Sequence, residues 1–288
     1  MSNHLTLASQ YSIQLIHKLN AQIFFKAFIL CLGSGVTLVT NAACLSDQPQ
    51  KGFVTCQYQR FSVMMNCQHR AAVLSWTTLT KDTGHGDTRN RHYRLDHDPA
   101  LQQCQQTSDD TYSSIFKGYD VGHLTAIDHF DDDIDAALET NFMTNLLPQN
   151  SSLNQHGAWR ETEKLVECYR DEPDFTPLTI LAGPIFGHDS SNDHYQISHS
   201  LPQTPDYYWK IILGSKQQRY SAWIIPNRSI QSKDLSTYTK NISDIIEAMK
   251  KDSVTTYEPV ISILEDLSRT QAVSVPMKND AKCNSRDN

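Results

Sequence analysis

His123 is the residue whose type and setting most clearly suggest chemistry. It closes the segment Tyr119-Asp120-Val121-Gly122-His123, in which Gly122 permits a tight turn and Asp120 can fix the loop. A histidine has an unperturbed pKa of about 6.5, so it can take a proton from water near neutral pH. The chain holds 12 histidines, however, and a Gly-His pair on a surface turn is the alternative interpretation. The segment suggests a general base without establishing one.

Asn154, about thirty residues further along, is a candidate metal ligand. Mg²⁺ prefers oxygen ligands and keeps several waters, so one amide carbonyl and a substrate phosphate can anchor it. Glu163 follows on a predicted helix and could hold a metal-bound water. Structural roles compete with both interpretations, since asparagine also favours helix N-caps and helix carboxylates are often only solvated.

Arg89 is the candidate for stabilising charge on a phosphate, because the guanidinium fork matches phosphate oxygens and never deprotonates. It lies in the only basic cluster of the sequence, where Lys81 and Arg91 are further candidates for binding substrate and Arg94 completes the group. Nearby aspartates neutralise part of this charge, so a solvated loop is the alternative. A base, a hard cation and an arginine are together what phosphodiester hydrolysis requires.

Several regular elements must position these side chains. Strands are predicted at 71–80, 178–182, 207–213 and 220–225, which are rich in β-branched and aromatic residues. Apolar residues at helical spacing predict helices over 159–170 and 241–251. We expect a secretory signal peptide over 1–43, a cysteine-bearing N-terminal arm over 44–70, one domain over 71–271 and a polar tail over 272–288.

The predicted leader carries Lys18 and Lys26, no acidic residue, and an apolar run that ends in small residues. An uncleaved anchor is the alternative to cleavage, and lipid attachment at Cys44 is a less favoured outcome of cleavage near Ala43. For the cleaved, mature chain we expect no stable membrane span. Six cysteines lie beyond the leader and suggest up to three disulfides, unless Cys168 is a buried free thiol: Cys44, Cys56, Cys67, Cys104, Cys168 and Cys283. No cysteine spacing suggests zinc.

The net charge of −7 disfavours a protein that coats nucleic acid by bulk charge. Removing the two leader lysines leaves 23 basic against 32 acidic side chains, a net charge of −9. A catalytic groove needs only a local positive field and a metal, so a nuclease is not excluded.

Two other segments suggest metal binding weakly. Residues 131–135 (DDDID) lack the glycine and terminal glutamate of a calcium loop, so a solvated acidic loop is expected. His188, His194 and His199 are irregularly spaced and are expected on a variable surface.

The order of several motifs resembles the DNA/RNA non-specific endonucleases, which are ββα-metal nucleases. Matching segments run from about Val73 to Met249: Thr88-Arg89-Asn90, Asp120-Val121-Gly122-His123, Thr144-Asn145-Leu146-Leu147-Pro148-Gln149, Leu153-Asn154 with Trp159 and Glu163, Ala182-Gly183-Pro184-Ile185, and Tyr208-Trp209-Lys210. The resemblance implies an α+β fold with a central, mostly antiparallel sheet flanked by helices. It implies His123 as general base, Asn154 as ligand of Mg²⁺ (with Mn²⁺ as a substitute), Arg89 as phosphate stabiliser, and Asn145 and Glu163 in support.

Three positions depart from the family pattern. Val121 replaces an arginine of the motif, which removes a positive group beside the scissile phosphate. His156 is an inserted residue before Trp159, which leaves Gln155 as the fallback ligand if the register differs. Glu167 stands where some members carry a basic residue, so a less positive groove is expected.

The sequence thus predicts an exported, Mg²⁺-dependent endonuclease, periplasmic or secreted, with DNA and RNA as substrates. Contacts to phosphate read no sequence, which is consistent with broad specificity. Two alternatives remain open: a non-catalytic module of the same fold that binds nucleic acid or protein, and a phosphodiesterase acting on small nucleotides.

Overall fold

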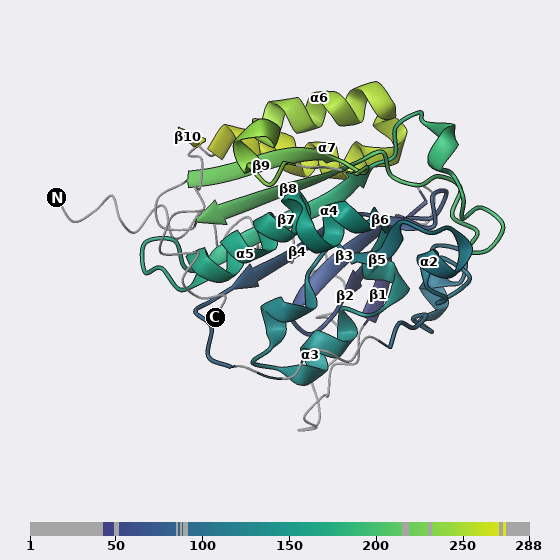
Figure 1. Cartoon of the computed structure of the whole chain (residues 1–288), viewed down its shortest axis with the longest axis horizontal. Coiled ribbons are helices and arrows are strands. Elements are labelled where there is room, and N and C mark those ends of the chain that lie inside the picture. Colours follow the sequence, from purple (N-terminus) through teal and green to yellow (C-terminus); the bar gives the residue numbers. More distant parts are fainter. Residues whose placement is uncertain are drawn as a thin grey trace.

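The structure is a computed structural model and describes residues 43–48, 52–84, 86, 88, 92–214, 219–229, 232–270 and 273–274. Its main sheet has eight strands in the order β1-β2-β3-β4-β7-β8-β9-β10 (Figure 1). These are β1 (Ala43–Gln48), β2 (Phe53–Gln57), β3 (Phe61–Asn66), β4 (Ala71–Leu79), β7 (Leu178–Ile185), β8 (Tyr207–Gly214), β9 (Arg219–Pro226) and β10 (Val273–Ser274). Neighbouring strands are antiparallel except β9 and β10. The predicted mostly antiparallel α+β fold is confirmed.

The four predicted strands are β4, β7, β8 and β9, and they form the centre of this sheet. All eight residues of β7 are buried, as its almost wholly apolar sequence predicts. For residues 44–70, in contrast, the sequence predicts a polar, cysteine-bearing arm and no strand. Their strands β2 and β3 are largely buried and pair with each other, and β3 pairs in turn with β4, so that Val54, Val63 and Met65 join the core. These strands are short and carry few β-branched residues in regular alternation, so the local residue pattern does not predict them.

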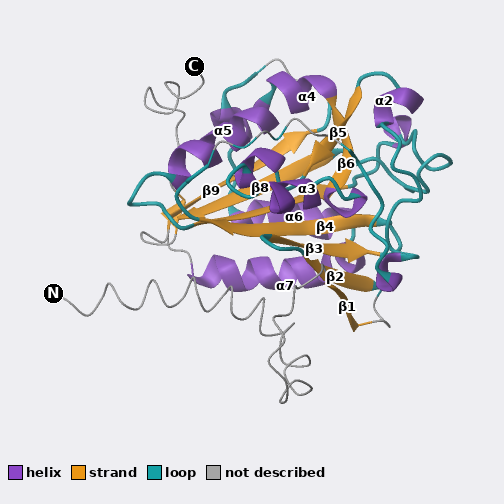
Figure 2. Ribbon diagram, turned by 90° about the horizontal axis from the view of Figure 1, so that it is seen from below, coloured by secondary structure: helices purple, strands orange, loops and turns teal. Residues whose placement is uncertain are grey.

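Helices cover both faces of the sheet. Figure 2 shows α4 (Ser151–His156) and α5 (Ala158–Arg170) on one side and α7 (Val254–Thr270) on the other. The other helices of the described residues are α2 (Tyr112–Ile115), α3 (Ile134–Glu139) and α6 (Ile242–Asp252). The predicted helices at 159–170 and 241–251 correspond to α5 and α6 within a residue at each end.

Helix α7 was not predicted. Pro259 lies inside it and its first three residues are β-branched, and both features weigh against a helix in sequence. The helix nevertheless buries a continuous stripe at helical spacing, made of Tyr257, Val260, Ile261, Leu264 and Leu267. Packing of this stripe against α6 and β4 outweighs the weak local preference.

A second, two-stranded sheet stands apart from the first and carries the motif residues. β5 (Tyr119–His123) pairs antiparallel with β6 (Leu146–Asn150), so that Asp120 lies opposite Gln149 and His123 opposite Leu146. Helices α4 and α5 follow β6 directly along the chain. Two strands followed by helix thus form one local unit, and short 3₁₀ turns at Ile127–Phe130 and Met143–Asn145 complete the connection between the strands.

Helix α5 is the longest element of this unit. Gly157 is its N-cap residue. The helix buries the side chains of Trp159, Thr162, Leu165 and Val166. Its last residue, Arg170, is fully buried, and its guanidinium donates to the carbonyls of Thr80 and His129 at 3.0 Å each, which offsets part of the cost of burying the charge. The C-terminal end of the helix is therefore fixed relative to the residue after β4 and to the 3₁₀ turn.

Two disulfides, Cys44–Cys56 and Cys67–Cys104, join the N-terminal strands to each other and to a loop. Cys168 is also disulfide-bonded, so the alternative of a free thiol is wrong. Cys283 and residues 1–42 of the predicted leader lie outside the described residues. None of the helices in the described ranges has the length and apolar character that crossing a bilayer would require.

Candidate active site

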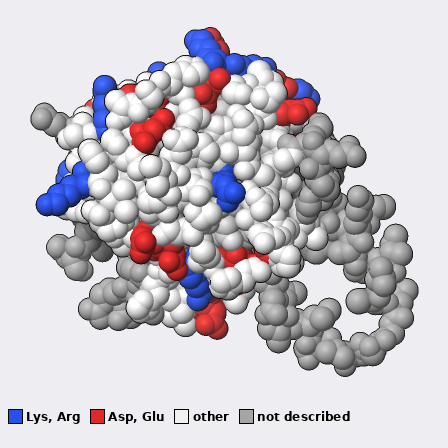
Figure 3. Space-filling model, turned by 90° about the vertical axis from the view of Figure 1, so that its right-hand side faces the viewer, with Lys and Arg blue, Asp and Glu red and all other residues white. Residues whose placement is uncertain are grey.

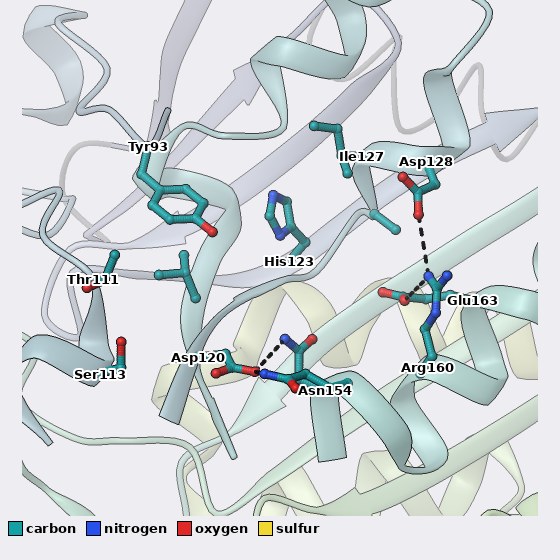
Figure 4. A pocket seen from close by; sticks show the side chains of 13 residues that line it. Tyr93, Thr111, Ser113, Asp120, His123, Ile127, Asp128, Asn154, Arg160 and Glu163 are labelled. Atoms are coloured by element: carbon teal, nitrogen blue, oxygen red, sulfur yellow. Dashed lines mark hydrogen bonds and ion pairs between the residues drawn. The ribbon is translucent and has the colours of Figure 1, made fainter. Parts of the chain in front are cut away.

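A cavity of about 510 Å³ lies beside the two-stranded unit (Figure 4). Its walls include Asp120 and His123 from β5, Asn154 from α4 and Glu163 from α5. Figure 4 shows these side chains facing a common space, with Arg160 between Asp128 and Glu163. Folding thus brings together four residues from two separate motifs, one on β5 and one on α4 and α5.

His123 is held rigidly at the cavity wall. Only 7% of its surface is exposed, and its Nε2 lies 3.0 Å from the side-chain oxygen of Asn141. An amide oxygen can only accept, so Nε2 carries a hydrogen, and in the neutral ring the lone pair is on Nδ1. Trp159 of α5 donates its indole N–H to the His123 carbonyl at 3.3 Å, which ties the base to the core. Asn141 was not identified from the sequence.

Asp120 orients two amide side chains. Its Oδ2 accepts from Asn154 Nδ2 at 3.2 Å and from Gln155 Nε2 at 2.8 Å, while Oδ1 accepts from Ser151 at 2.7 Å. Because each amide nitrogen donates to Asp120, the carbonyl oxygens of Asn154 and Gln155 are the atoms left for a cation.

The alternative that Asn154 is an N-cap is wrong. Asn150 caps α4 and Gly157 is the N-cap of α5, whereas Asn154 lies inside α4. His156, the predicted insertion, is exposed, is the last residue of α4 and does not line the cavity. Gln155, the fallback ligand, also lines the cavity.

Glu163 and Asp128 share one guanidinium. Arg160 Nη1 lies 3.3 Å from Glu163 Oε2 and 3.4 Å from Asp128 Oδ2, and Thr88 donates to the other oxygen of Asp128 at 2.7 Å. Burial acts to lower the pKa of Arg160, but Glu163 and Asp128 outweigh it and raise the pKa above its usual value. Neither Arg160 nor Asp128 was identified from the sequence, because neither belongs to a matching motif.

Asn145 lies behind the cavity rather than in its wall. Its side chain is fully buried, donates to the carbonyls of Thr125 and Thr140 at 2.9 Å each, and accepts from the Thr125 N–H. It thereby joins the chain that leaves β5 to the chain that enters β6, a supporting position.

The predicted basic cluster is only partly described. Arg89 and Arg91 lie outside the described residues, and Lys81 is exposed and not among the residues that line the cavity. Arg94 stacks over the Phe142 ring at 4.3 Å. Glu167 contacts His129 and Arg170 instead of the cavity. On the face drawn in Figure 3, the described basic residues are scattered among acidic ones and form no continuous patch.

Hard oxygen donors characterise the cavity. Two amide oxygens and the carboxylates of Asp120 and Glu163 line it, and these donors suit Mg²⁺ better than a soft metal. Within the described ranges, no three His, Cys, Asp or Glu side chains gather as a ligand cluster. The residues present therefore fit a cation that keeps most of its waters and is held by one or two protein oxygens.

The two weaker metal candidates have structural roles. In the acidic segment, Asp132 pairs with Arg60 and Asp133 caps α3, so these carboxylates are not merely solvated. His199 is fully buried between Ser198 and the Asp110 carbonyl, contrary to the expected surface position, and His194 stacks on Phe116. These side chains therefore make structural contacts within the fold, and the structure gives no support for a metal site at either segment.

Comparison with known proteins gives a consistent result. The family model described as DNA/RNA non-specific endonuclease matches residues 46–259. Nuclease C1 of Cunninghamella echinulata is 27% identical over 241 residues, covering 77% of this chain and 92% of that protein. The nuclease of Serratia marcescens is 25% identical over 221 residues, covering 74% and 80%. The mouse mitochondrial nuclease EXOG is 23% identical over 210 residues, covering 68% and 56%.

The fold also has a counterpart among solved structures. A chain from the crystal structure of an EndoG/EndoGI complex superposes with a TM-score of 0.54 at 16% sequence identity. The match covers 67% of this chain and 82% of that chain, and it supports the fold alone.

Proposed function

The chain belongs to the DNA/RNA non-specific endonuclease family, and from this premise we propose that it is an exported, Mg²⁺-dependent endonuclease that hydrolyses DNA and RNA. The observation that carries the proposal is the convergence of His123, Asn154 and Glu163 on one cavity from β5, α4 and α5. A base, an oxygen ligand for a hard cation and a supporting carboxylate are the groups that phosphodiester hydrolysis needs.

His123 acts as the general base in this proposal. Asn141 fixes the hydrogen on Nε2, so Nδ1 takes the proton from the attacking water. Burial and the bond from Trp159 hold the ring at the cavity wall, which limits the reorganisation needed for proton transfer.

Asn154 supplies the cation ligand, with Gln155 beside it. Asp120 holds both amide nitrogens and so presents both carbonyl oxygens, while Glu163 can accept hydrogen bonds from ordered water. When bound there, Mg²⁺, or Mn²⁺ as a substitute, would polarise the phosphate and neutralise charge on the leaving oxygen. Arg89, Arg91 and Lys81 remain proposed phosphate-binding residues.

Export is part of the proposal. The disulfides Cys44–Cys56 and Cys67–Cys104 are expected in an oxidising compartment, which agrees with a signal peptide over 1–43. The arm, domain and tail boundaries at 44–70, 71–271 and 272–288 remain proposals as well.

Digestion of supercoiled plasmid and of RNA by the oxidised protein tests the function. We expect cleavage with Mg²⁺, none with EDTA, and at least about 10²-fold slower cleavage by His123→Ala. Added imidazole should restore part of the activity of His123→Ala, because it can occupy the vacated space as a base. His156→Ala, which alters an exposed histidine outside the cavity, is the matched control and should cleave normally.

Other outcomes would redirect the proposal. Tight DNA binding by folded protein without cleavage under any divalent metal would favour the non-catalytic module. Turnover of a small diester without polymer cleavage would favour a phosphodiesterase of small nucleotides. Full activity of His123→Ala would remove His123 as the base.

A further inference from the structure

The described charges of the cavity are unfavourable for a polyanion. Asp120, Asp128 and Glu163 line it against a single described cation, Arg160. The wall of β5 adds no charge, because Val121 lies there with 7% of its surface exposed. Positive charge in the wall would therefore favour entry of a phosphodiester.

Arg160 occupies an unusual position for an arginine. It is the third residue of α5, in the first turn, where the helix dipole disfavours a cation. Its side chain is nevertheless directed to the cavity, with Asp128 on one side and Glu163 on the other (Figure 4). The two carboxylates offset the unfavourable dipole and fix where the guanidinium lies.

The contacts of Arg160 leave most of its fork available. Both carboxylates approach the same atom, Nη1, at 3.3 and 3.4 Å, which are long distances for charged hydrogen bonds. Within the described part of the chain, Nε and Nη2 make no hydrogen bond, and 39% of the side chain is exposed. A guanidinium held by one nitrogen can present the other two to a phosphate.

We propose that Arg160 is a phosphate-binding residue of this site and supplies, from α5, the positive charge that Val121 does not supply from β5. Its Nε and Nη2 donate to non-bridging oxygens of the substrate phosphate, and its charge stabilises the transition state. The proposal rests on the proposed function. It concerns a residue outside the matching motifs, so it describes how this particular chain binds its substrate.

Lys164 provides a matched control on the same helix. It pairs with Glu161 at 3.6 Å, is 33% exposed, and is not among the cavity-lining residues. Lys164→Ala therefore removes the same charge from α5 without changing the cavity. Arg160→Lys keeps the charge and loses the planar fork.

Two measurements test the proposal. Cleavage of a short duplex with Mg²⁺ should show kcat/KM about 10²-fold lower for Arg160→Ala, intermediate for Arg160→Lys, and nearly unchanged for Lys164→Ala. Binding of the same duplex in EDTA, measured from 50 to 300 mM salt, should show a slope of log Kd against log salt smaller by about one unit for Arg160→Ala only. Denaturant midpoints serve as the folding control.

The binding measurement keeps this inference separable from the proposed function. If the wild-type protein binds but does not cleave, the endonuclease proposal fails and the salt slope still decides the role of Arg160. Equal slopes for wild type and Arg160→Ala would overturn the inference, as would equal losses in Arg160→Ala and Lys164→Ala. In that case the guanidinium only ties α5 to Asp128.

Discussion

Lys210 of β8 places an amino group in the core against Trp159 of α5. Its side chain is fully buried, its Nζ lies 3.8 Å from the centroid of the Trp159 ring, and it has no hydrogen-bond partner in the described part of the protein. Burial lowers the pKa of Lys210 from 10.5 to about 8, while Glu163 acts to raise it and Arg160 to lower it. Trp159 in turn contacts His123, so this lysine supports the cavity wall.

The depressed pKa of Lys210 predicts a pH-dependent stability. Between pH 8 and 10.5 the unfolded chain holds more protons on this lysine than the folded chain, so stability rises with pH there. Below pH 8 both states are protonated and the contribution is constant. We expect wild type to gain about 1–2 kcal/mol over Lys210→Met between pH 8 and 9.5.

Urea unfolding of both proteins at pH 7, 8 and 9.5 measures this difference. Lys233→Met, a change at an exposed lysine, is the control and should show a constant difference from wild type. A constant difference for Lys210→Met as well would show that the buried lysine keeps an ordinary pKa.

At the scale of elements, the pairing of β5 with β6 sets the geometry of the site. Gly122 lies between Asp120 and His123, and the fully buried Gln149 side chain fills the space beside it. A Cβ at Gly122 would lie 2.3 Å from Gln149 Cγ and Cδ. Glycine is required there because a neighbouring side chain occupies the space that any other residue needs.

Gly122→Ala should therefore destabilise the protein by about 1–3 kcal/mol and slow cleavage by displacing His123. The informative control is the same substitution in a Gln149→Ala background, where the clashing atoms are gone. Denaturant unfolding of the four proteins measures the coupling between the two positions. An equal destabilisation in both backgrounds would place the origin of the effect elsewhere.

At the scale of the whole molecule, one disulfide reinforces a strand pair and the other joins the sheet to a loop: Cys44 and Cys56 are cross-strand partners of β1 and β2, whereas Cys67 and Cys104 lie outside the strands. Cys44–Cys56 closes a separation of 12 residues, and Cys67–Cys104 closes one of 37 and links the turn after β3 to the loop beyond Pro99–Leu101. The longer closed loop removes more conformational entropy from the unfolded chain.

Replacing each pair by serines should lower the free energy of unfolding. The Cys67/Cys104 variant should lose about 1 kcal/mol more than the Cys44/Cys56 variant, on the dependence of loop entropy on length. Unfolding curves recorded without reductant measure both losses, and wild type with reductant should be less stable than either variant. The reverse order of the two losses would show that local packing, not loop closure, governs the effect.

The local pattern of the sequence determined much of this protein. β-branched runs predicted β4, β7, β8 and β9, and helical spacing predicted α5 and α6, because each of these elements carries its period within its own residues. Ordered motifs indicated the family and identified Asp120, His123, Asn154 and Glu163. Helix α7 and strands β2 and β3 were missed because long-range packing, not local preference, stabilises them.

Only the tertiary structure decided which side chains share the cavity. The contacts of Asn141 with His123, of Arg160 with Asp128 and of Lys210 with Trp159 join residues on separate elements, so no spacing along the chain reveals them. A motif identifies residues of a required type at fixed spacing along the chain. Hydrogen-bond partners and compensating charges depend on distances in space, which are set only when β5, β6, α4 and α5 pack against the main sheet.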